Sequence, residues 1–362
     1  MVTPIIKRKA HSLFQMLVSI FLSFVLALFI GGVIIELTGE SALNTYKVLV
    51  NGAFVGKNNI SETLIKSSIL LLTGLSYAFV AECGLINIGA EGQLYIGAAC
   101  STAVGIYWTF LPGPLHMLIA LLAGFIGGMV WGGIVGFFKA KFGANEIIIS
   151  LMMNYIAALL VSYLVHAPMK DLTQTYPYSY RIADSAKLPR LLEGTRLHAG
   201  IIVALVCLIL YWFYYKYTSR GYRMRVIGQN RLAAEYAGYN VRKNVFVAMM
   251  IGGGFAGLGG ALEILGIQYR LFDNFSSGYG FDGISAALLA NSNPAGMALT
   301  SILFGGLRNG GLMIQMRTNV SSTLTSVVQS LVIILVLMKV FNRLPFRGKK
   351  KEIDITGKRS SN

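Results

Sequence analysis

Charged side chains are scarce in this sequence, since Asp, Glu, Lys and Arg together make up only 13% of its 362 residues. Hydrophobic residues make up 55%, and the mean hydropathy is +0.63. The apolar residues come in runs of about twenty, the length of a helix that crosses a bilayer, rather than in amphipathic alternation. This pattern excludes an ordinary soluble domain and predicts an all-α polytopic membrane protein with about 8–10 transmembrane helices.

Cysteine and histidine are also rare, which limits the chemistry that the chain can perform. Its three cysteines lie in or beside apolar segments without a CxxC spacing: Cys83, Cys100 and Cys207. Its four histidines show no HExxH motif or other ligand spacing: His11, His116, His166 and His198. We therefore expect cysteines that act as small packing residues, no metal site and no cofactor bound by this chain. The apolar segments also lack a His/Asp or Ser/Lys constellation, so an enzyme is not expected.

Acidic residues number 15 against 31 basic ones, which gives a formal net charge of +16. In a soluble chain this excess would suggest a nucleic acid partner, but here Lys and Arg cluster between apolar segments and near both ends. By the positive-inside rule, such clusters face the cytoplasm. We therefore predict no nucleic acid partner, a cytoplasmic N-terminal tail at 1–12, a single transmembrane domain at 13–340 and a basic cytoplasmic C-terminal tail at 341–362.

Nine apolar segments follow one another along the chain: 13–37, 63–81, 84–107, 115–138, 146–166, 199–217, 245–267, 281–307 and 322–340. Nine single crossings cannot leave both termini on the same side. The run Asn291-Ser-Asn-Pro-Ala-Gly296 interrupts the segment 281–307, because proline lacks an amide donor and disfavours helix at the preceding residue. We predict a broken pair near 281–307, which is either a re-entrant loop or two short full crossings.

This topology sorts the connecting segments into two groups. Those predicted outside are 38–62, 108–114, 167–198, 268–280 and 308–321, and those predicted inside are 139–145 and 218–244. The long segment 167–198 has mixed charges and several Tyr and Pro without sustained periodicity. It is predicted to be an extracellular loop, which serves as a contact surface or is an ordinary surface connection.

Glycine recurs every fourth residue at Gly124, Gly128, Gly132 and Gly136, and a second cluster lies within 252–260. Small residues at this spacing let the backbones of two membrane helices approach closely. The pattern therefore predicts compact helix packing rather than direct contacts with a ligand.

Polar residues interrupt the apolar segment 84–107, where the run Asn87-Ile-Gly-Ala-Glu-Gly-Gln93 lies. An ionised carboxylate in lipid costs roughly 2.5–3.5 kcal/mol even on lenient insertion scales. Glu91 is therefore expected to face protein or water.

The inner segment 218–244 contains the signals of a short helix. Asn230 is a good N-cap, residues 231–237 can form two turns, and Gly238 suits the left-handed position just past a helix end. We predict a surface helix in the largest inner loop, on which small alanines let a partner surface come close. The alternative is a solvated connector with basic ends.

Four ordered blocks carry a resemblance to a known family. They are Gly84-Leu-Ile-Asn-Ile-Gly-Ala-Glu-Gly-Gln93, Ala144-Asn-Glu-Ile-Ile-Ile-Ser-Leu-Met-Met-Asn-Tyr155, Arg225-Val-Ile-Gly-Gln-Asn-Arg-Leu-Ala-Ala-Glu-Tyr-Ala-Gly238, and Gly280-Phe-Asp-Gly-Ile-Ser-Ala-Ala-Leu-Leu-Ala290 with Asn293-Pro-Ala-Gly296 and Phe304-Gly-Gly-Leu-Arg308. Over roughly residues 60–340 the chain resembles the permease subunits of bacterial ABC importers in the branched-chain amino acid and simple-sugar group. The first block is similar to the nucleoside-type branch.

The resemblance implies an importer of two permeases and two ATPases in the bacterial cell membrane, fed by an extracellular binding lipoprotein. In such systems a short cytoplasmic permease helix docks in the ATPase, and the matching residues here are Asn230, Arg231, Ala233, Ala234, Glu235 and Gly238. The chain itself has no GxxxxGK[ST] motif, so ATP is expected to be used by a separate subunit. Pairing with itself or with a paralogue stays open.

The resemblance also implies a nucleoside path between the two permeases. Polar solutes need hydrogen-bond partners there, and the candidate residues are Asn87, Glu91, Gln93, Tyr95, Asn154, Phe281 and Asp282. Phe281 or Tyr95 would stack on a base. Two structural alternatives stay open, in which Glu91 is a buried carboxyl bonded to backbone amides and Asn87 caps a helix. A simple sugar, a riboflavin-like solute and an ion-coupled secondary transporter also remain as alternatives.

Overall fold

The computed structural model describes residues 25–37, 39–318, 326–327, 330–331 and 334. Over these residues the chain is built from helices, and its only strand pairings are three isolated bridges. A first helix covers Val25–Leu37. It is followed by α2 (Ala42–Phe54), α3 (Lys57–Ala81), α4 (Ala90–Tyr107), α5 (Gly113–Phe142), α6 (Glu146–His166), the 3₁₀ turn η1 (Asp184–Ala186), α7 (Gly200–Tyr217), α8 (Ser219–Gln229), α9 (Arg231–Tyr236), α10 (Val241–Glu263), the π turn η2 (Ile264–Gln268), α11 (Tyr279–Leu289) and α12 (Pro294–Arg317).

Five of the described helices are long and apolar enough to cross a membrane: α3, α5, α6, α7 and α10 with its π turn. Val25–Leu37 and α2 would together make a sixth span, bent by 120°. The prediction of a helical multi-pass membrane protein is confirmed. The predicted segment 322–340 lies almost wholly outside the described residues.

Three predicted boundaries are wrong. The segment 84–107 is not one helix, because the chain is irregular until α4 begins at Ala90 and Gly84 has a φ of +74°. The segments 38–62 and 308–321, expected to be loops, are largely helical, since they contain α2, the start of α3 and the end of α12. Hydropathy missed these helices because they carry many polar side chains. Those of the first segment are mostly exposed, whereas Asn309 is bonded inside the protein to the carbonyl oxygens of Gly52 and Asn59.

The break within 281–307 is confirmed. Helix α11 ends at Leu289 and α12 begins at Pro294, with Asn291 and Ser292 at positive φ between them. Asn293 caps α12 by accepting a hydrogen bond of 3.2 Å from the backbone N–H of Gly296. The chain before α11 bonds to the 167–198 segment, and α12 returns to the start of α3 at the same end of the molecule. This arrangement favours the re-entrant alternative over two full crossings.

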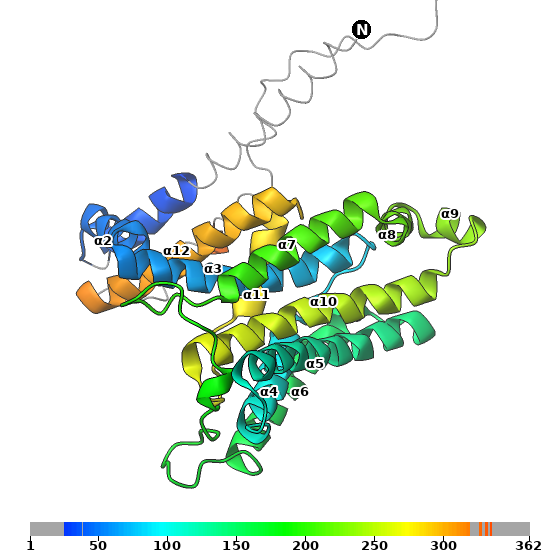
Figure 1. The fold of residues 1–362 in the computed structure, drawn as a ribbon. Helices are drawn as coiled ribbons and strands as arrows, with labels where there is room; N and C mark the ends of the chain where they lie inside the picture. Colours follow the sequence, from blue (N-terminus) through cyan, green and yellow to red (C-terminus); the bar gives the residue numbers. More distant parts are fainter. Residues whose placement is uncertain (1–24, 38, 319–325, 328–329, 332–333, 335–362) are drawn as a thin grey trace, which may run out of the picture.

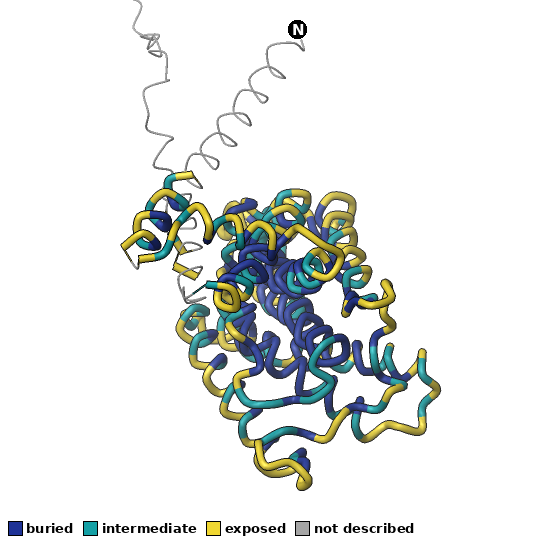
Figure 2. Tube along the Cα trace, turned by 90° about the vertical axis from the view of Figure 1, so that its left-hand side faces the viewer, coloured by how far each residue is buried: buried dark blue, intermediate teal, exposed yellow. Residues whose placement is uncertain are grey.

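Glycine lines the centre of the bundle, where α10 packs side by side with α5 (Figure 1). A Cβ atom built on Gly128 would lie 2.2 Å from the carbonyl oxygen of Gly253, and one on Gly257 would lie 2.3 Å from that of Gly124. The predicted close approach is confirmed, because at these positions only glycine has room. Figure 2 shows the resulting buried centre, surrounded by exposed outer helix faces.

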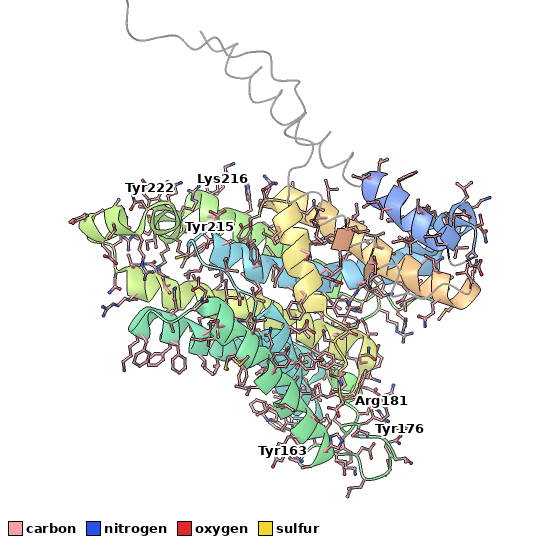
Figure 3. The ribbon with its side chains drawn as sticks, turned by 180° about the vertical axis from the view of Figure 1, so that it is seen from behind. Tyr163, Tyr176, Arg181, Tyr215, Lys216 and Tyr222 are labelled. Carbon is pink, nitrogen blue, oxygen red and sulfur yellow. The ribbon has the colours of Figure 1, made fainter. Side chains whose placement is uncertain are left out.

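The two ends of the bundle differ. Helices α8 and α9 lie at one end, with Tyr222 and Lys216, and the 167–198 segment lies at the other, with Tyr176 and Arg181 (Figure 3). That segment packs on the chain before α11, since the N–H groups of Ser179 and Ile182 bond to the carbonyl oxygens of Leu271 and Tyr269. The 167–198 segment is therefore bonded to the rest of the fold.

Candidate functional site

Asn87 and Gln93 are fully buried and bonded to one another. The amide nitrogen of Asn87 lies 3.0 Å from Gln93 Oε1 and 2.9 Å from Ser76 Oγ, while Asn87 Oδ1 accepts from the backbone N–H of Gly89 at 3.0 Å. This network holds the irregular segment before α4 against α3. In this conformation both side chains use their hydrogen-bonding groups within the protein, and a contact with solute stays a prediction.

Glu91 joins the start of α4 to the start of α11. Its Oε2 atom accepts a hydrogen bond of 2.6 Å from the backbone N–H of Gly280, and its side chain is 8% exposed. A carboxylate in the first turn of a helix is stabilised by the positive end of the helix dipole. Gly280 is required here, because a Cβ on it would lie 2.4 Å from the backbone nitrogen of Glu91. In the structural alternative, in which Glu91 is a buried carboxyl bonded to backbone amides, the partner is thus the N–H group of Gly280.

Asn154 on α6 also binds the start of α4. Its Oδ1 atom accepts from the N–H of Gly92 at 2.8 Å, and its amide donates to the carbonyl oxygen of Ile88 at 3.0 Å. It therefore satisfies backbone groups that the late start of α4 leaves without helical partners. Asn145 caps α6 by accepting from the N–H of Ile147 at 3.0 Å, and Glu146 pairs with Lys139 at 2.7 Å.

The two aromatic candidates have different surroundings. Tyr95 is 5% exposed, packs edge-on against Phe275 at 4.8 Å between ring centroids and donates to the carbonyl oxygen of Ser276. Phe281, at the start of α11, is 44% exposed. Of these two side chains, only that of Phe281 is exposed in this conformation.

Asp282 lies next to Phe281 and pairs with Arg308 of α12, at 3.1 Å between Oδ2 and Nε. The guanidinium group of Arg308 lies over the ring of Tyr279, 4.0 Å from its centroid, and donates to the carbonyl oxygen of Ser277. One arginine thus ties α12 to the start of the re-entrant pair. Arg308 was not among the predicted path residues, although an arginine within a mostly apolar helix is itself a signal of function.

Two further ionisable side chains were missed, the buried Glu263 and the half-buried Lys66. Glu263, at the end of α10, is 3% exposed and accepts from Gln268 of the π turn at 2.8 Å. Lys66 on α3 donates to Asn309 on α12 at 2.8 Å. Charged groups inside apolar segments are the signal that would have found both. They lie on helices that pack around the re-entrant pair.

The predicted short helix at the other end of the molecule is confirmed as α9. Asn230 accepts a hydrogen bond from the N–H of Ala233 at 3.0 Å, and Gly238 has a φ of +79°. Arg231, Ala233 and Glu235 are exposed along it. The helix projects from the bundle between α8 and α10 (Figure 1).

The exposed face of α9 carries two large apolar side chains that the sequence interpretation overlooked. Leu232 is 68% exposed and Tyr236 is 93% exposed, and their i, i+4 spacing puts them on one face. The expectation for Ala234 is wrong, because this side chain is fully buried and packs against its own chain. The signal that could have found the correct face was the spacing of Leu232 and Tyr236 in a polar loop.

Comparisons with known proteins agree with this architecture. Residues 59–337 match the model of the family described as the branched-chain amino acid transport system / permease component. The chain is 36% identical over 355 residues to the guanosine ABC transporter permease protein NupP of Bacillus subtilis, covering 96% of this chain and 99% of that protein. It is 33% identical to the glucose ABC transporter permease protein TsgB13 of Haloferax volcanii, covering 93% of each chain.

A third relative, the nucleoside ABC transporter permease protein NupB of Lactococcus lactis, is 28% identical and covers 80% of this chain and 82% of that protein. No solved structure matches. Because the family model spans most of the chain and two relatives are 36% and 33% identical over nearly its full length, this multi-pass membrane protein belongs to the branched-chain amino acid transport permease family.

Proposed function

We propose that this chain is a permease subunit of an ABC importer in the bacterial cell membrane and that its solute is a nucleoside. The observation that carries the proposal is the similarity over nearly full length to a permease named for guanosine. A second permease, a separate ABC ATPase and an extracellular substrate-binding lipoprotein complete the importer. A paralogue is the favoured second permease, since Bacillus subtilis has both NupP and NupQ, each named for guanosine.

A sugar is the second candidate solute, because the relative TsgB13 is named for glucose. Guanosine uptake by cells that express the complete importer is expected to be saturable and to be reduced by excess adenosine or uridine but not by glucose. A radiolabelled uptake assay measures this. Competition by glucose, but by neither adenosine nor uridine, would show that the solute is a sugar rather than a nucleoside.

We place the solute path along the exposed side of α11, beside Phe281. The ring of Phe281 is the open aromatic surface on which a base can stack, and the Asp282–Arg308 pair lies next to it. The other predicted path residues are buried and bonded within the protein in this conformation: Asn87, Glu91, Gln93, Tyr95 and Asn154. Their hydrogen bonds fix the wall of the path rather than reaching across it.

Glu91→Gln is expected to lower uptake more than it lowers the amount of folded chain. The glutamine oxygen can still accept from Gly280 N–H, but the substitution removes the ionisable carboxyl group from the start of α11. Uptake rates divided by the amount of chain in the membrane measure the effect. Glu91→Ala is the matched comparison, because it leaves a buried amide without an acceptor, at a cost of roughly 1–3 kcal/mol. Equal losses of uptake and folded chain in Glu91→Gln would assign Glu91 a purely structural role.

Helix α9 is proposed to dock on the ATPase at the cytoplasmic end. Its exposed Leu232 and Tyr236 suit a hydrophobic cleft, and Arg231 and Glu235 add charged contacts at the rim. The basic residues around α8 and α10 support the cytoplasmic placement of this end, and with it the extracellular placement of 167–198.

A further inference from the structure

A pocket of about 660 Å³ lies between the end of α7, α8 and the start of α10. Three basic side chains line it: Arg220 and Arg223 from α8 and Lys243 from α10. The rings of Tyr214 and Tyr239 also line it, and the guanidinium group of Arg223 lies 5.9 Å from the centroid of Tyr239. Helices α8 and α10 thus bring three positive charges to one concave site.

None of these three cations takes part in an ion pair within the part of the chain that the structure describes. Other basic residues are neutralised in pairs, as Lys139 is by Glu146. Helix α10 also begins at the pocket, so the positive end of its dipole adds to the field of the side chains. The pocket therefore has the charge of a site for an anion.

The surroundings place the pocket at the membrane surface. The last turns of α7 expose Trp212, Phe213 and Tyr217, and α8 exposes Tyr222. Aromatic rings of this kind gather where a membrane helix reaches the head groups. Figure 3 shows Lys216 and Tyr222 on the outer edge of this end. A phosphate of a lipid can therefore enter the pocket while its acyl chains stay along α7.

We propose that this pocket binds the phosphate group of an anionic phospholipid from the membrane leaflet at this end of the molecule. Arg220, Arg223 and Lys243 are the ligands of the phosphate. Basic pockets between membrane helices at the cytoplasmic surface are suited to such head groups. The site is separate from the exposed face of α9, since neither Leu232 nor Tyr236 lines it. Bound lipid would fix the position of α8 relative to α10. Helix α9 connects these two helices, so its position would be fixed as well.

The test measures lipid binding to the full-length chain, purified with its co-expressed partners, by native mass spectrometry with added phosphatidylglycerol or phosphatidylcholine. The wild type is expected to prefer phosphatidylglycerol. The triple variant Arg220→Gln, Arg223→Gln, Lys243→Gln should lose roughly 100-fold of that preference, about fivefold for each cation removed.

A matched triple variant removes three exposed cations at the same end that do not line the pocket: Lys141→Gln, Lys216→Gln and Arg242→Gln. It should keep the preference of the wild type. Equal losses in the two triple variants would overturn the proposal, because they would show attraction by the overall charge. Inorganic phosphate that binds the chain as tightly as the lipid would also overturn it, in favour of a soluble anion.

If the pocket variant does not fold, Arg220→Lys with Arg223→Lys provides the second test. This pair keeps both positive charges and should retain the preference for phosphatidylglycerol. Loss of the preference in a folded Lys variant would contradict recognition by charge.

Discussion

Uptake and solute-stimulated ATP hydrolysis are expected to be nearly abolished when Leu232→Ser and Tyr236→Ser are combined, while the permease stays folded in the membrane. Both side chains are largely exposed on α9, and the proposed docking uses them as its apolar contacts with the ATPase. Apolar and aromatic anchors in protein interfaces cost about 2 kcal/mol or more each when truncated, which is roughly 30-fold in affinity. Reconstitution of the complete importer, with ATP hydrolysis measured with and without solute, tests this result.

Two comparison variants separate docking from folding. Tyr222→Ser removes an exposed tyrosine on α8 at the same end and should leave ATP hydrolysis coupled to solute. Ala234→Leu places a large side chain at a buried position of α9, so it should reduce the amount of folded chain. If the double serine variant retained solute-stimulated hydrolysis at the wild-type level, α9 would not be the coupling element.

Gly257→Ala is expected to leave little folded chain in the membrane, although it adds a single methyl group. The new Cβ would lie 2.3 Å from the carbonyl oxygen of Gly124 and 2.8 Å from the Cα of Gly128. These are backbone atoms of α5, so α5 and α10 must move apart along their whole contact. Overpacking of a core typically costs about 1–3 kcal/mol. A clash between the backbones of α5 and α10 at the centre of the bundle lies at the upper end of that range or above it.

Gly259→Ala is the matched control, two residues later in the same helix. Its Cβ would meet nothing closer than Thr73 Cγ2 at 3.6 Å. Alanine favours a helix by about 1 kcal/mol over glycine, so this variant should be at least as stable as the wild type. Thermal unfolding of the detergent-solubilised chain, followed by size-exclusion chromatography, compares the two. Similar midpoints would show that the glycine contact between α5 and α10 contributes little.

Several local features could be predicted because their signals lie within a few residues. Asn230 and Gly238 define the ends of α9 through a cap and a left-handed residue, and both are observed. Pro294 predicted the break between α11 and α12. The long apolar runs predicted the spanning helices, and for most helix ends the predicted position lies within one turn of the observed one.

Other features depend on partners that are distant in sequence. The side chain of Asn87 bonds to Ser76 and Gln93, and that of Glu91 bonds to a backbone amide 189 residues away. Their burial followed from how α3, α4 and α11 meet, which no local pattern specifies. The end of α12 within 308–321 was missed for the same reason, because hydropathy counts Asn309 as solvated although the fold supplies its hydrogen bonds.

The sequence by itself determined the class of this protein. Runs of apolar residues require helices in a bilayer, because lipid offers no partners for backbone amides, and the four ordered blocks pointed to the permease family. The tertiary structure alone decided which polar residues face inward. Glu91 joins the starts of two helices, and Asn87 bonds within the irregular segment before α4 rather than capping that helix. Phe281 is exposed, and Arg220, Arg223 and Lys243 line one pocket. The physical reason is that burial and charge pairing arise from contacts between helices, and these contacts exist only after the helices have packed.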